Sequence, residues 1–416
     1  MKLNPHKIQT RNARVNRHLD AITPIFDVNL AWVTIQISCR RSALPKSRSN
    51  LQELARFSVF VDSKVLTLVL TQDFGEMHVS FSVSVNTELK TDSKHYLELS
   101  PNFEIAYMTT LITGGTGFVG QELVKRLDDV TITSRNRERA LGKFTSDHSP
   151  DHSRSPQVIQ WSPTNEVIKI PESMNVDAVV NLMGESVAEG RWTDQKKKRI
   201  RESRIQGTRN LVDGLVDSGK LPKVFVSASA IGIYGNPGED IVEEDHAHGE
   251  GFLTEVCQQW EAEALKLEQH GTRVVCLRIG IVLGGQGGAL EKMVPIFKFG
   301  LGGKLGNGKQ WMAWIHVDDL VSMIQWSLEN ESVSGPINGT APNPVRNSEF
   351  TKALAKTLGR PAFLPAPRFG LRLAFGEFAD SLFWSQRIVP AAALNHGFQF
   401  QFPELTEALK DILSAA

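Results

Sequence analysis

One glycine-rich stretch organises this chain: Thr110-Leu111-Ile112-Thr113-Gly114-Gly115-Thr116-Gly117-Phe118-Val119-Gly120. Leu111 and Ile112 predict the end of a buried strand. Apolar residues then recur at helical spacing, at Phe118, Val119, Leu123, Val124 and Leu127. Strand, glycine turn and helix form a phosphate-binding site, because free backbone N–H groups and the helix dipole face the anion. The glycine spacing is G-x-x-G-x-x-G, whereas dehydrogenases have G-x-G-x-x-G. We interpret the stretch as a dinucleotide-binding turn; a tight packing turn is the alternative.

Composition sets limits on the partners. The 416 residues include 46 basic and 46 acidic ones, which gives no electrostatic case for nucleic acid. The three cysteines, Cys39, Cys257 and Cys276, are far apart, so no disulfide framework and no metal site are expected. This usage fits a reducing compartment, and we expect a cytoplasmic protein. No apolar run approaches the roughly 20 residues of a membrane helix, so no membrane partner is expected.

The first 107 residues differ from the rest. Basic residues far outnumber acidic ones in residues 1–50, a bias that resembles an organelle transit peptide and equally fits an upstream start codon. From Phe57 to Tyr107 the sequence alternates as strands do. Met108 stands two residues before the first core strand. We expect residues 1–107 to be an extension that the fold does not need, either disordered or a mis-assigned start.

From Met108 onward strands alternate with helices. Strands are predicted at 130–133, 158–161, 178–182, 223–227 and 274–277, and helices at 194–214 and 253–270. This α/β pattern predicts a Rossmann-type doubly wound parallel sheet, which binds ligands at the carboxyl ends of its strands. We expect a nucleotide-binding domain at 108–283 and a smaller substrate lobe at 284–416, with part of segment 313–340 returning to the Rossmann core. The glycine-rich loops at 284–288 and 300–308 are expected to be mobile enough to close over a ligand.

The end of the second strand reads the ribose of a dinucleotide. An acidic residue there would bond the 2′-hydroxyl, and a basic residue would accept a 2′-phosphate. This chain has Ser134 and Arg135, with Arg137 and Arg139 behind them and no acid before Glu138. The sequence therefore predicts NADP in preference to NAD.

Two further strand ends and one helix carry candidate ligand contacts. Gly184 follows the fourth strand and lets a cofactor pass, and Glu185 beside it is either catalytic or a helix cap. Ser227 and Ser229 follow the fifth strand and can bond a substrate carbonyl or the nicotinamide ribose. In helix 194–214 we interpret the charge run Lys196–Arg201 as a solvated face, and Arg204 as a residue that can point into the site.

These motifs together resemble those of the extended short-chain dehydrogenase/reductases. More narrowly, the chain is similar to an atypical branch, the NAD-dependent epimerase/dehydratase family with a C-terminal domain of unknown function. Some bacterial members carry the label cell division inhibitor, and plant members are chloroplast proteins. The resemblance covers Met108 to about Leu413. Besides the glycine turn, the stretches that carry it are Asn181–Glu185, Arg191-Trp192, Ser227–Ser229, Phe252–Glu261, Gly302–Gly308, Trp314–Asp319 and Thr340–Val345.

The resemblance implies a role for each matching position. The residues implied to hold the pyrophosphate are Gly114, Thr116, Gly117, Phe118 and Val119. Ser134 and Arg135 would hold the adenosine phosphate. The residues implied to border the ribose and nicotinamide are Leu182, Met183, Gly184, Glu185, Ile279 and Gly280. Ser229 occupies the place of the catalytic serine or threonine.

One departure from the family pattern concerns the acid/base. The reductases use a Tyr-x-x-x-Lys pair, whose lysine lowers the pKa of the tyrosine. In this chain the two places read Leu253 and Cys257. Tyr234 is the one tyrosine within the expected fold, and Gly238 stands four residues after it. The candidates that remain for moving a proton are Ser229, Glu185, Tyr234 and His316.

Two hypotheses for function follow. The first is an NADP(H)-dependent oxidoreductase or epimerase with a displaced acid/base, acting on a small polar substrate. We expect its turnover to depend on Glu185, with a pKa raised by burial, together with Ser229. The second is a non-catalytic regulator, for example in cell division, that senses NADP(H) and signals to a protein partner.

Overall fold

The computed structural model describes residues 34–36, 53–61, 64–72, 82–85, 108–144 and 156–414, and the chain divides into two units at residues 106 and 107. In the first unit four strands pair antiparallel in chain order: β1 (Thr34–Gln36), β2 (Glu53–Val61), β3 (Lys64–Gln72) and β4 (Ser82–Val85). The strand-like alternation after Phe57 falls on β2, β3 and β4. Apart from β1, the basic first fifty residues lie outside the described residues.

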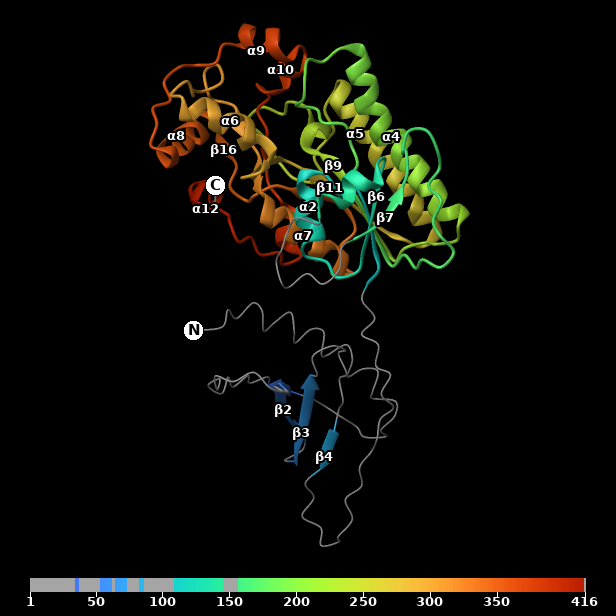
Figure 1. Ribbon diagram of the computed structural model, residues 1–416. Helices are drawn as coiled ribbons and strands as arrows, with labels where there is room; N and C mark the ends of the chain where they lie inside the picture. The colour runs from blue at the N-terminus through green and yellow to red at the C-terminus, as the bar shows by residue number, and fades with distance from the viewer. Residues whose placement is uncertain are drawn as a thin grey trace, which may run out of the picture. The chain divides into compact units, whose positions relative to one another are not determined.

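The second unit, Tyr107–Ala416, is built on a seven-stranded sheet in the order β15-β11-β9-β8-β5-β6-β7, with every neighbouring pair parallel (Figure 1). Its strands are β5 (Thr110–Thr113), β6 (Val130–Ser134), β7 (Gln157–Gln160), β8 (Ala178–Asn181), β9 (Val224–Ala230), β11 (Arg273–Ile279) and β15 (Gly335–Gly339). The order reverses at β5, which has β6 on one side and β8 on the other. The prediction of a Rossmann-type doubly wound sheet is confirmed, with its switch point at the glycine turn.

Helices cover both faces of this sheet because successive strand residues point to opposite faces. Leu111 packs in one buried cluster with Leu211 of α4 (Asp194–Asp217) and with Phe225. Ile112, the next residue, packs in another with Leu123 of α2 (Phe118–Val124) and Ile324 of α7 (Val317–Glu329). Each fully buried Leu or Ile stabilises the fold by about 1.5–3 kcal/mol. In Figure 1, α4 lies beside α5 (Phe252–Leu265) on one side of the sheet.

The predicted helices are present with shifted ends. The helix expected at 194–214 extends to Asp217 as α4. The helix expected at 253–270 is α5 followed by a 3-10 turn, Lys266–His270. The predicted strand at 158–161 is β7, which ends at Gln160, and the one at 274–277 is β11, which is longer at both ends.

The C-terminal third adds a second layer. β12 (Ile281–Gly284) pairs with β14 (Trp314–His316), and α6 (Gly288–Lys298), α8 (Asn347–Leu358) and α12 (Leu405–Ser414) enclose a third cluster around Trp314 and Phe350. α7 and β15 follow β14 in the chain yet belong to the Rossmann layer. Shorter elements are α3 (Arg137–Leu141), a 3-10 turn (Ile231–Tyr234), β10 (Ile241–Val242), β13 (Trp311–Met312), β16 (Val345–Arg346), β17 (Arg387–Ile388) and α11 (Ala391–Asn395).

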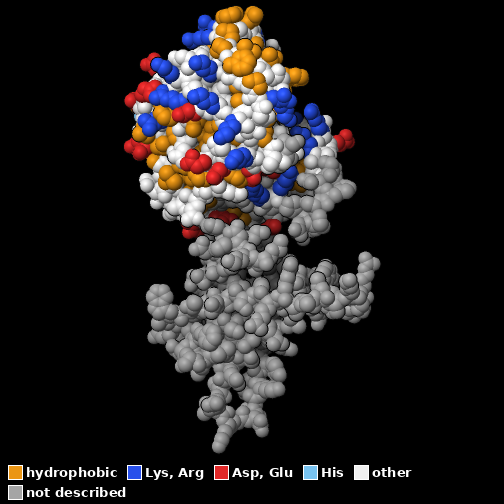
Figure 2. All heavy atoms as spheres, turned by 90° about the vertical axis from the view of Figure 1, so that its left-hand side faces the viewer, with side chains coloured by type: hydrophobic (Ala, Val, Ile, Leu, Met, Phe, Trp, Pro, Cys, Tyr) orange, Lys and Arg blue, Asp and Glu red, His pale blue; other side chains and the backbone are white. Residues whose placement is uncertain are grey.

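Two more helices, α9 (Arg368–Phe375) and α10 (Phe378–Ser381), lie at one end of the C-terminal part. Figure 2 shows apolar side chains gathered at the top of the view, where these helices lie in Figure 1. Phe369 and Leu373 of α9 are 79% and 74% exposed. α9 therefore presents an apolar face to solvent.

The glycine loops expected to close over a ligand are packed in this structure. Residues 284–288 form a tight loop closed by two antiparallel bridges, Leu283 with Gly288 and Gly284 with Gly287. The ring of Phe118 fills the space that side chains here would need, since a Cβ on Gly284 would lie 2.2 Å from Phe118 Cζ. In the second loop, a Cβ on Gly303 would lie 1.7 Å from the carbonyl oxygen of Leu364. These glycines thus permit close packing, and closure over a ligand stays a prediction.

Candidate functional site

The glycine turn has the geometry that its spacing predicts. Gly114 adopts φ +70°, and the N–H of Gly117 donates to the Gly114 carbonyl at 2.9 Å. A Cβ on Gly114 would lie 2.5 Å from the Leu182 carbonyl oxygen, and a Cβ on Gly120 would lie 2.4 Å from that of Gly114. The turn is therefore pressed against the end of β8 and the start of α2. Gly117 is exposed and Thr116 half-buried, so both face outward at the switch point.

A lysine that the sequence pattern did not single out reaches this turn. Lys143 follows α3, and its Nζ donates to the Thr116 carbonyl at 2.7 Å. Arg135 at the end of β6 is exposed, as are Arg137 and Arg139. Lys143 thus places a cation at the glycine turn, and Arg135 follows the end of β6. Ser134 is held in a local turn, because its Oγ donates to the Asn136 carbonyl at 2.9 Å.

A buried polar group joins three neighbouring strands beside the turn. Asn181, at the end of β8, accepts from Thr113 Oγ1 at 2.7 Å. Its Nδ2 donates to Thr208 Oγ1 at 2.9 Å and to Ser227 Oγ at 3.2 Å. Trp260 of α5 also donates to Thr208 Oγ1, at 2.9 Å. Ser227, a predicted ligand contact, is thus tied to the sheet interior.

Glu185 lies just beyond β8 and is ion-paired to α4. Its Oε1 accepts from Lys196 Nζ at 2.8 Å and from Arg199 Nε at 3.3 Å. The bond from Lys196 holds the pKa of the Glu185 carboxyl below its usual value, with Arg199 adding to it and burial opposing it. The expectation that burial raises this pKa is wrong, because two cations outweigh the burial. The interpretation of 196–201 as a solvated face is also wrong at Lys196, which is 4% exposed.

Ser203 and Arg204 of α4 hold the backbone of the same loop. Ser203 Oγ accepts from the Glu185 N–H at 2.9 Å, and Arg204 Nη1 donates to the Glu185 carbonyl at 3.0 Å. The Arg204 guanidinium lies 5.1 Å from the centre of the Trp260 ring and against Gly184, where a Cβ would come within 3.0 Å of Cζ. Burial lowers the pKa of Arg204. The absence of a side chain at Gly184 therefore leaves room for the guanidinium of Arg204. The sequence pattern did not reveal this reason for a glycine at position 184.

Ser229 belongs to a buried chain of hydrogen bonds that spans β9, β11 and β15. Its Oγ donates to Glu261 Oε1 of α5 at 2.6 Å. Arg278 of β11 binds both oxygens of Glu261, from Nε at 2.9 Å and from Nη2 at 3.0 Å. Arg278 Nη1 also donates to Tyr234 Oη at 2.8 Å, and Tyr234 donates to Asn338 Oδ1 of β15 at 2.7 Å. Two candidate catalytic residues, Ser229 and Tyr234, are thus joined through Glu261 and Arg278.

The surroundings of Tyr234 limit its acidity. Burial raises the pKa of the Tyr234 phenol to about 12, although Arg278 and Asn338 work against this rise. Its hydroxyl already has a donor and an acceptor, so both roles are occupied. We therefore rank Tyr234 below Ser229 as a group that moves a proton.

The end of β11 meets the C-terminal layer. Ile279 is the last residue of β11, and the Gly280 N–H donates to the Gly339 carbonyl at 3.0 Å. A Cβ on Gly280 would lie 2.8 Å from the Ala313 carbonyl oxygen. Gly280 thus lets the chain pass from the sheet to β12.

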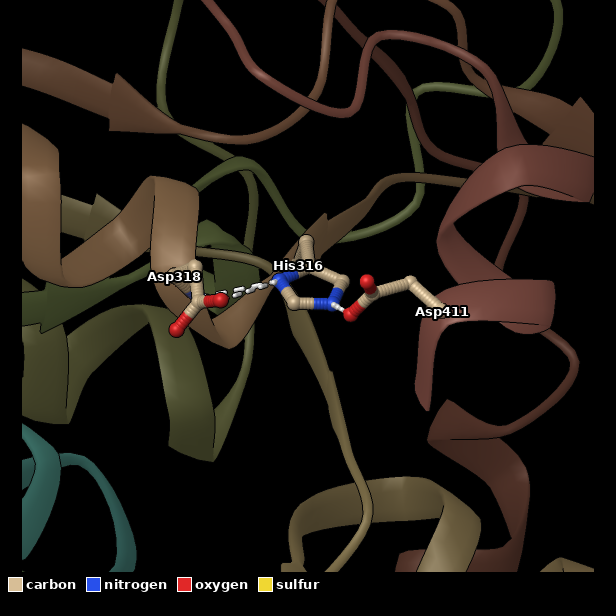
Figure 3. A group of neighbouring side chains, drawn as sticks. All are labelled: His316, Asp318 and Asp411. Atoms are coloured by element: carbon tan, nitrogen blue, oxygen red, sulfur yellow. Dashed lines mark hydrogen bonds and ion pairs between the residues drawn. The ribbon is translucent and has the colours of Figure 1, made fainter. Parts of the chain in front are cut away.

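His316 lies in a cluster with two aspartates, which Figure 3 shows at opposite edges of the ring. Its Nδ1 accepts from the Asp318 N–H at 3.0 Å and caps α7, while Nε2 lies 3.4 Å from Asp411 Oδ2 of α12. The ring is buried and stacks on Phe402. Because the cap occupies Nδ1 and the carboxylates flank different nitrogens, we interpret the cluster as a helix cap joined to α12. Its partners come from α7 and from Phe402–Asp411, and not from the strand ends that carry Glu185 and Ser229.

The fold and the turn at its switch point define a Rossmann-type protein. Residues 110–338 match the family described as NAD dependent epimerase/dehydratase family, and residues 366–412 match a domain of unknown function, DUF1731. The chain belongs to the NAD dependent epimerase/dehydratase family, which confirms the resemblance stated above. Within the described residues, no helix combines the length and apolar character needed to cross a membrane.

Several relatives are similar over most of their length. The epimerase family protein SDR39U1 homolog, chloroplastic, of Arabidopsis thaliana is 38% identical over 332 residues, which cover 77% of this chain and 91% of that protein. Epimerase family protein YfhF of Bacillus subtilis is 38% identical over 312 residues, 74% of this chain and 98% of that protein. The crystal structure of human epimerase family protein SDR39U1 (isoform2) with NADPH has a TM-score of 0.66 and 33% identity, over 74% of this chain and 100% of that one.

Proposed function

We propose that this chain is an NADP(H)-dependent oxidoreductase or epimerase that acts on a small polar substrate. Its glycine turn at the switch point and the basic side chains near β6 suit a dinucleotide with a 2′-phosphate. The human relative SDR39U1 was solved with NADPH. The family membership supports a reaction in which a nicotinamide takes or returns a hydride.

The donor set around the turn fits this cofactor. The residues proposed to hold its pyrophosphate are Gly114, Thr116, Gly117, Phe118 and Val119, acting through the backbone at Phe118 because its ring packs on the 284–288 loop. Ser134 and Arg135 would hold the 2′-phosphate, with Lys143 as an added cation. The residues proposed to border the ribose and nicotinamide are Leu182, Met183, Gly184, Glu185, Ser227, Ile279 and Gly280, whereas the guanidinium of Arg204 lies beside this group, against Gly184.

The observation that carries the catalytic part is the bond from Ser229 to Glu261. The nicotinamide would supply hydride transfer, so the chain itself must move a proton at the substrate oxygen. In the oxidation direction, Ser229 Oγ would accept the hydroxyl proton of the substrate and pass its own proton to Glu261, as the substrate gives up a hydride and becomes a carbonyl compound. Reduction reverses both transfers. Ser229 gains one proton as it loses another and stays neutral throughout. The serine hydroxyl therefore does not have to ionise, although it is a weak acid.

Arg278 has a positioning role in this scheme. It holds both oxygens of the Glu261 carboxylate, and its side chain is 4% exposed. Glu185 remains a second candidate for catalysis, at the edge of the site. The alternative of a cofactor-sensing regulator, for example in cell division, has no comparable arrangement behind it in the described part of the chain. A cytoplasmic location, or an organellar one if residues 1–50 are a transit peptide, stays a prediction.

The test uses the purified full chain. NADPH binding is measured first by the change in its fluorescence, and pools of small polar metabolites are then screened by NADPH absorbance. We expect NADPH to bind more tightly than NADH and at least one pool to be turned over. Tight NADPH binding without turnover in any pool, in either direction, would contradict the enzyme proposal and favour the regulator.

A further inference from the structure

Arg204 is a half-buried cation that forms no ion pair with a described residue. It comes from the middle of α4 and lies between the loop after β8 and the Trp260 ring of α5. Glu185 offers it a backbone carbonyl alone, because the Glu185 carboxylate is bonded to Lys196 and Arg199. A charge in such a place is costly unless something pairs with it.

The hydrogen-bond capacity of Arg204 is only partly used. A guanidinium has five N–H donors in a fixed fork. Nη1 donates to the carbonyls of Glu185 at 3.0 Å and Ile200 at 3.3 Å. The donors on Nε and Nη2 have no acceptor among the described residues. Nη2 lies where a Cβ on Gly184 would come within 3.0 Å, and Gly184 itself is exposed, so a ligand can approach from that side.

Arg204 is not among the residues proposed to hold the cofactor's phosphates. The pyrophosphate turn follows β5, and the basic residues for the 2′-phosphate follow β6. Arg204 lies beside the loop after β8, which neighbours β5 on the side opposite β6. Because the turn and the residues after β6 are the parts proposed to hold the cofactor's phosphates, we assign the anion at Arg204 to a different molecule.

We propose that Arg204 binds a carboxylate or phosphate group of the substrate, through Nε and Nη2. The proposal rests on the proposed function and narrows its substrate from a small polar molecule to an anionic one. Planar bidentate recognition of such groups is what a guanidinium does best. Stacking on Trp260 and the bonds from Nη1 fix the orientation of the fork before the ligand arrives.

The test titrates two anions, malonate and inorganic phosphate, into NADPH-saturated full-length protein by calorimetry. The wild type should bind at least one of them, and the stronger binder identifies the group. Arg204→Gln should weaken that binding by about 10- to 150-fold, the worth of one charge-assisted hydrogen bond, and leave NADPH affinity within about threefold. Arg201→Gln is the matched control, because Arg201 is an exposed residue of the same helix that pairs with Glu255. It should bind both anions as the wild type does.

Arg204→Lys provides for the case in which Arg204→Gln does not fold. It keeps the charge and loses the fork, so it should bind NADPH normally and the anion more weakly. Unchanged anion binding in a folded variant, no anion binding by the wild type, or equal loss of NADPH and anion binding would each overturn the inference. A wild type that does not bind NADPH would contradict the proposed function instead.

Discussion

Ser229 Oγ lies 2.6 Å from Oε1 of Glu261, and both side chains are buried. Because an ionised carboxylate can only accept, the direction of this bond is fixed: the serine donates. Ser229 Oγ is then left to accept a proton from a ligand. In the proposed relay, this carboxylate on α5 is the proton acceptor, because the Tyr-x-x-x-Lys pair is absent from this chain.

Replacing Ser229 with Ala should remove activity and spare the fold. Glu261 keeps its two bonds from Arg278, so the free energy of unfolding should fall by only about 0.5–1.5 kcal/mol. Turnover should fall by roughly 10²–10⁴-fold, with NADPH affinity retained. Urea unfolding, NADPH titration and turnover on the identified substrate measure the three quantities. Ser327→Ala is the control, since it loses a comparable buried bond, to the Met323 carbonyl in α7, and should keep full activity. Full activity in Ser229→Ala would show that the relay is wrong.

Arg135→Asp should change cofactor choice. If Arg135 bonds the 2′-phosphate, its loss should weaken NADPH binding by on the order of 10- to 150-fold. NADH, which lacks this phosphate, should bind almost as before. Fluorescence titration of both cofactors checks this. Arg139→Asp places the same charge change on α3 and should weaken NADPH less. Equal weakening of NADPH and NADH by Arg135→Asp would mean that Arg135 supports the fold.

A methyl group in the 284–288 loop should destabilise the protein through Phe118. In Gly287→Ala the new Cβ would lie 2.5 Å from Phe118 Cδ2, so the ring must move, at a cost of about 1–3 kcal/mol. Adding Phe118→Leu should recover part of this loss. Gly285→Ala is a control, because the nearest atom to its Cβ is 3.6 Å away, and it should change stability little. Urea unfolding of the four proteins gives the comparison; equal stability of the two alanine variants would refute the packing account.

His316 should make stability depend on pH. Burial lowers the pKa of His316, against the opposing effects of Asp318, Asp411 and Asp319. The unfolded chain therefore binds a proton at His316 more readily than the folded chain does. The stability that the neutral imidazole contributes is fully present above the unfolded pKa of about 6.5, and it is lost as the pH falls toward the pKa in the folded protein. The slope is at most about 1.4 kcal/mol per pH unit.

The matched variant for this slope is His316→Asn. Asparagine can still accept from the Asp318 N–H and cap α7, but it does not titrate. Its free energy of unfolding, measured between about pH 5 and 8, should fall less steeply than that of the wild type as the pH is lowered. Identical slopes would show that His316 is as easily protonated in the folded protein as in the unfolded one.

A chain that begins at Met108 should fold and bind NADPH as the full chain does. The Rossmann unit begins at Tyr107, and the family match begins at residue 110. Solubility, far-UV circular dichroism and NADPH titration of both lengths check this. Insoluble shortened protein beside soluble full-length protein would show that the first unit is needed.

The local signals in the sequence were sufficient for the fold. The spacing of Gly114, Gly117 and Gly120 between a strand and a helix predicted the turn, and the apolar runs predicted the strands. The ion pairs of the site could not be predicted from local signals. Lys196 stands in a run of charges, and nothing local distinguishes the one residue of the run that Glu185 draws into the interior.

Glu261, the partner of Ser229, has a feature in the sequence whose meaning became clear only in the structure. Cys257, Trp260, Glu261 and Ala264 share one buried stripe of α5, so Glu261 is a carboxylate at an apolar position. Arg278 likewise interrupts the apolar strand β11. Glu261 and Arg278 are each an unusual charged residue at an apolar position, and the sequence alone does not predict that they form an ion pair. The mispredicted pKa of Glu185 has the same cause, since it depended on cations from another element.

The hydrogen bonds of Asn181 have a consequence for assembly of the sheet. β5, β8 and β9 are buried on both faces, so their apolar residues alone would tolerate a slip of one strand along another. Asn181 bonds Thr113 of β5 and Ser227 of β9, and it is paired opposite both. Any slip would leave a buried amide and two buried hydroxyls unsatisfied, at about 1–3 kcal/mol each. A single asparagine therefore sets the register of three strands, and with it the alignment of every ligand-facing strand end.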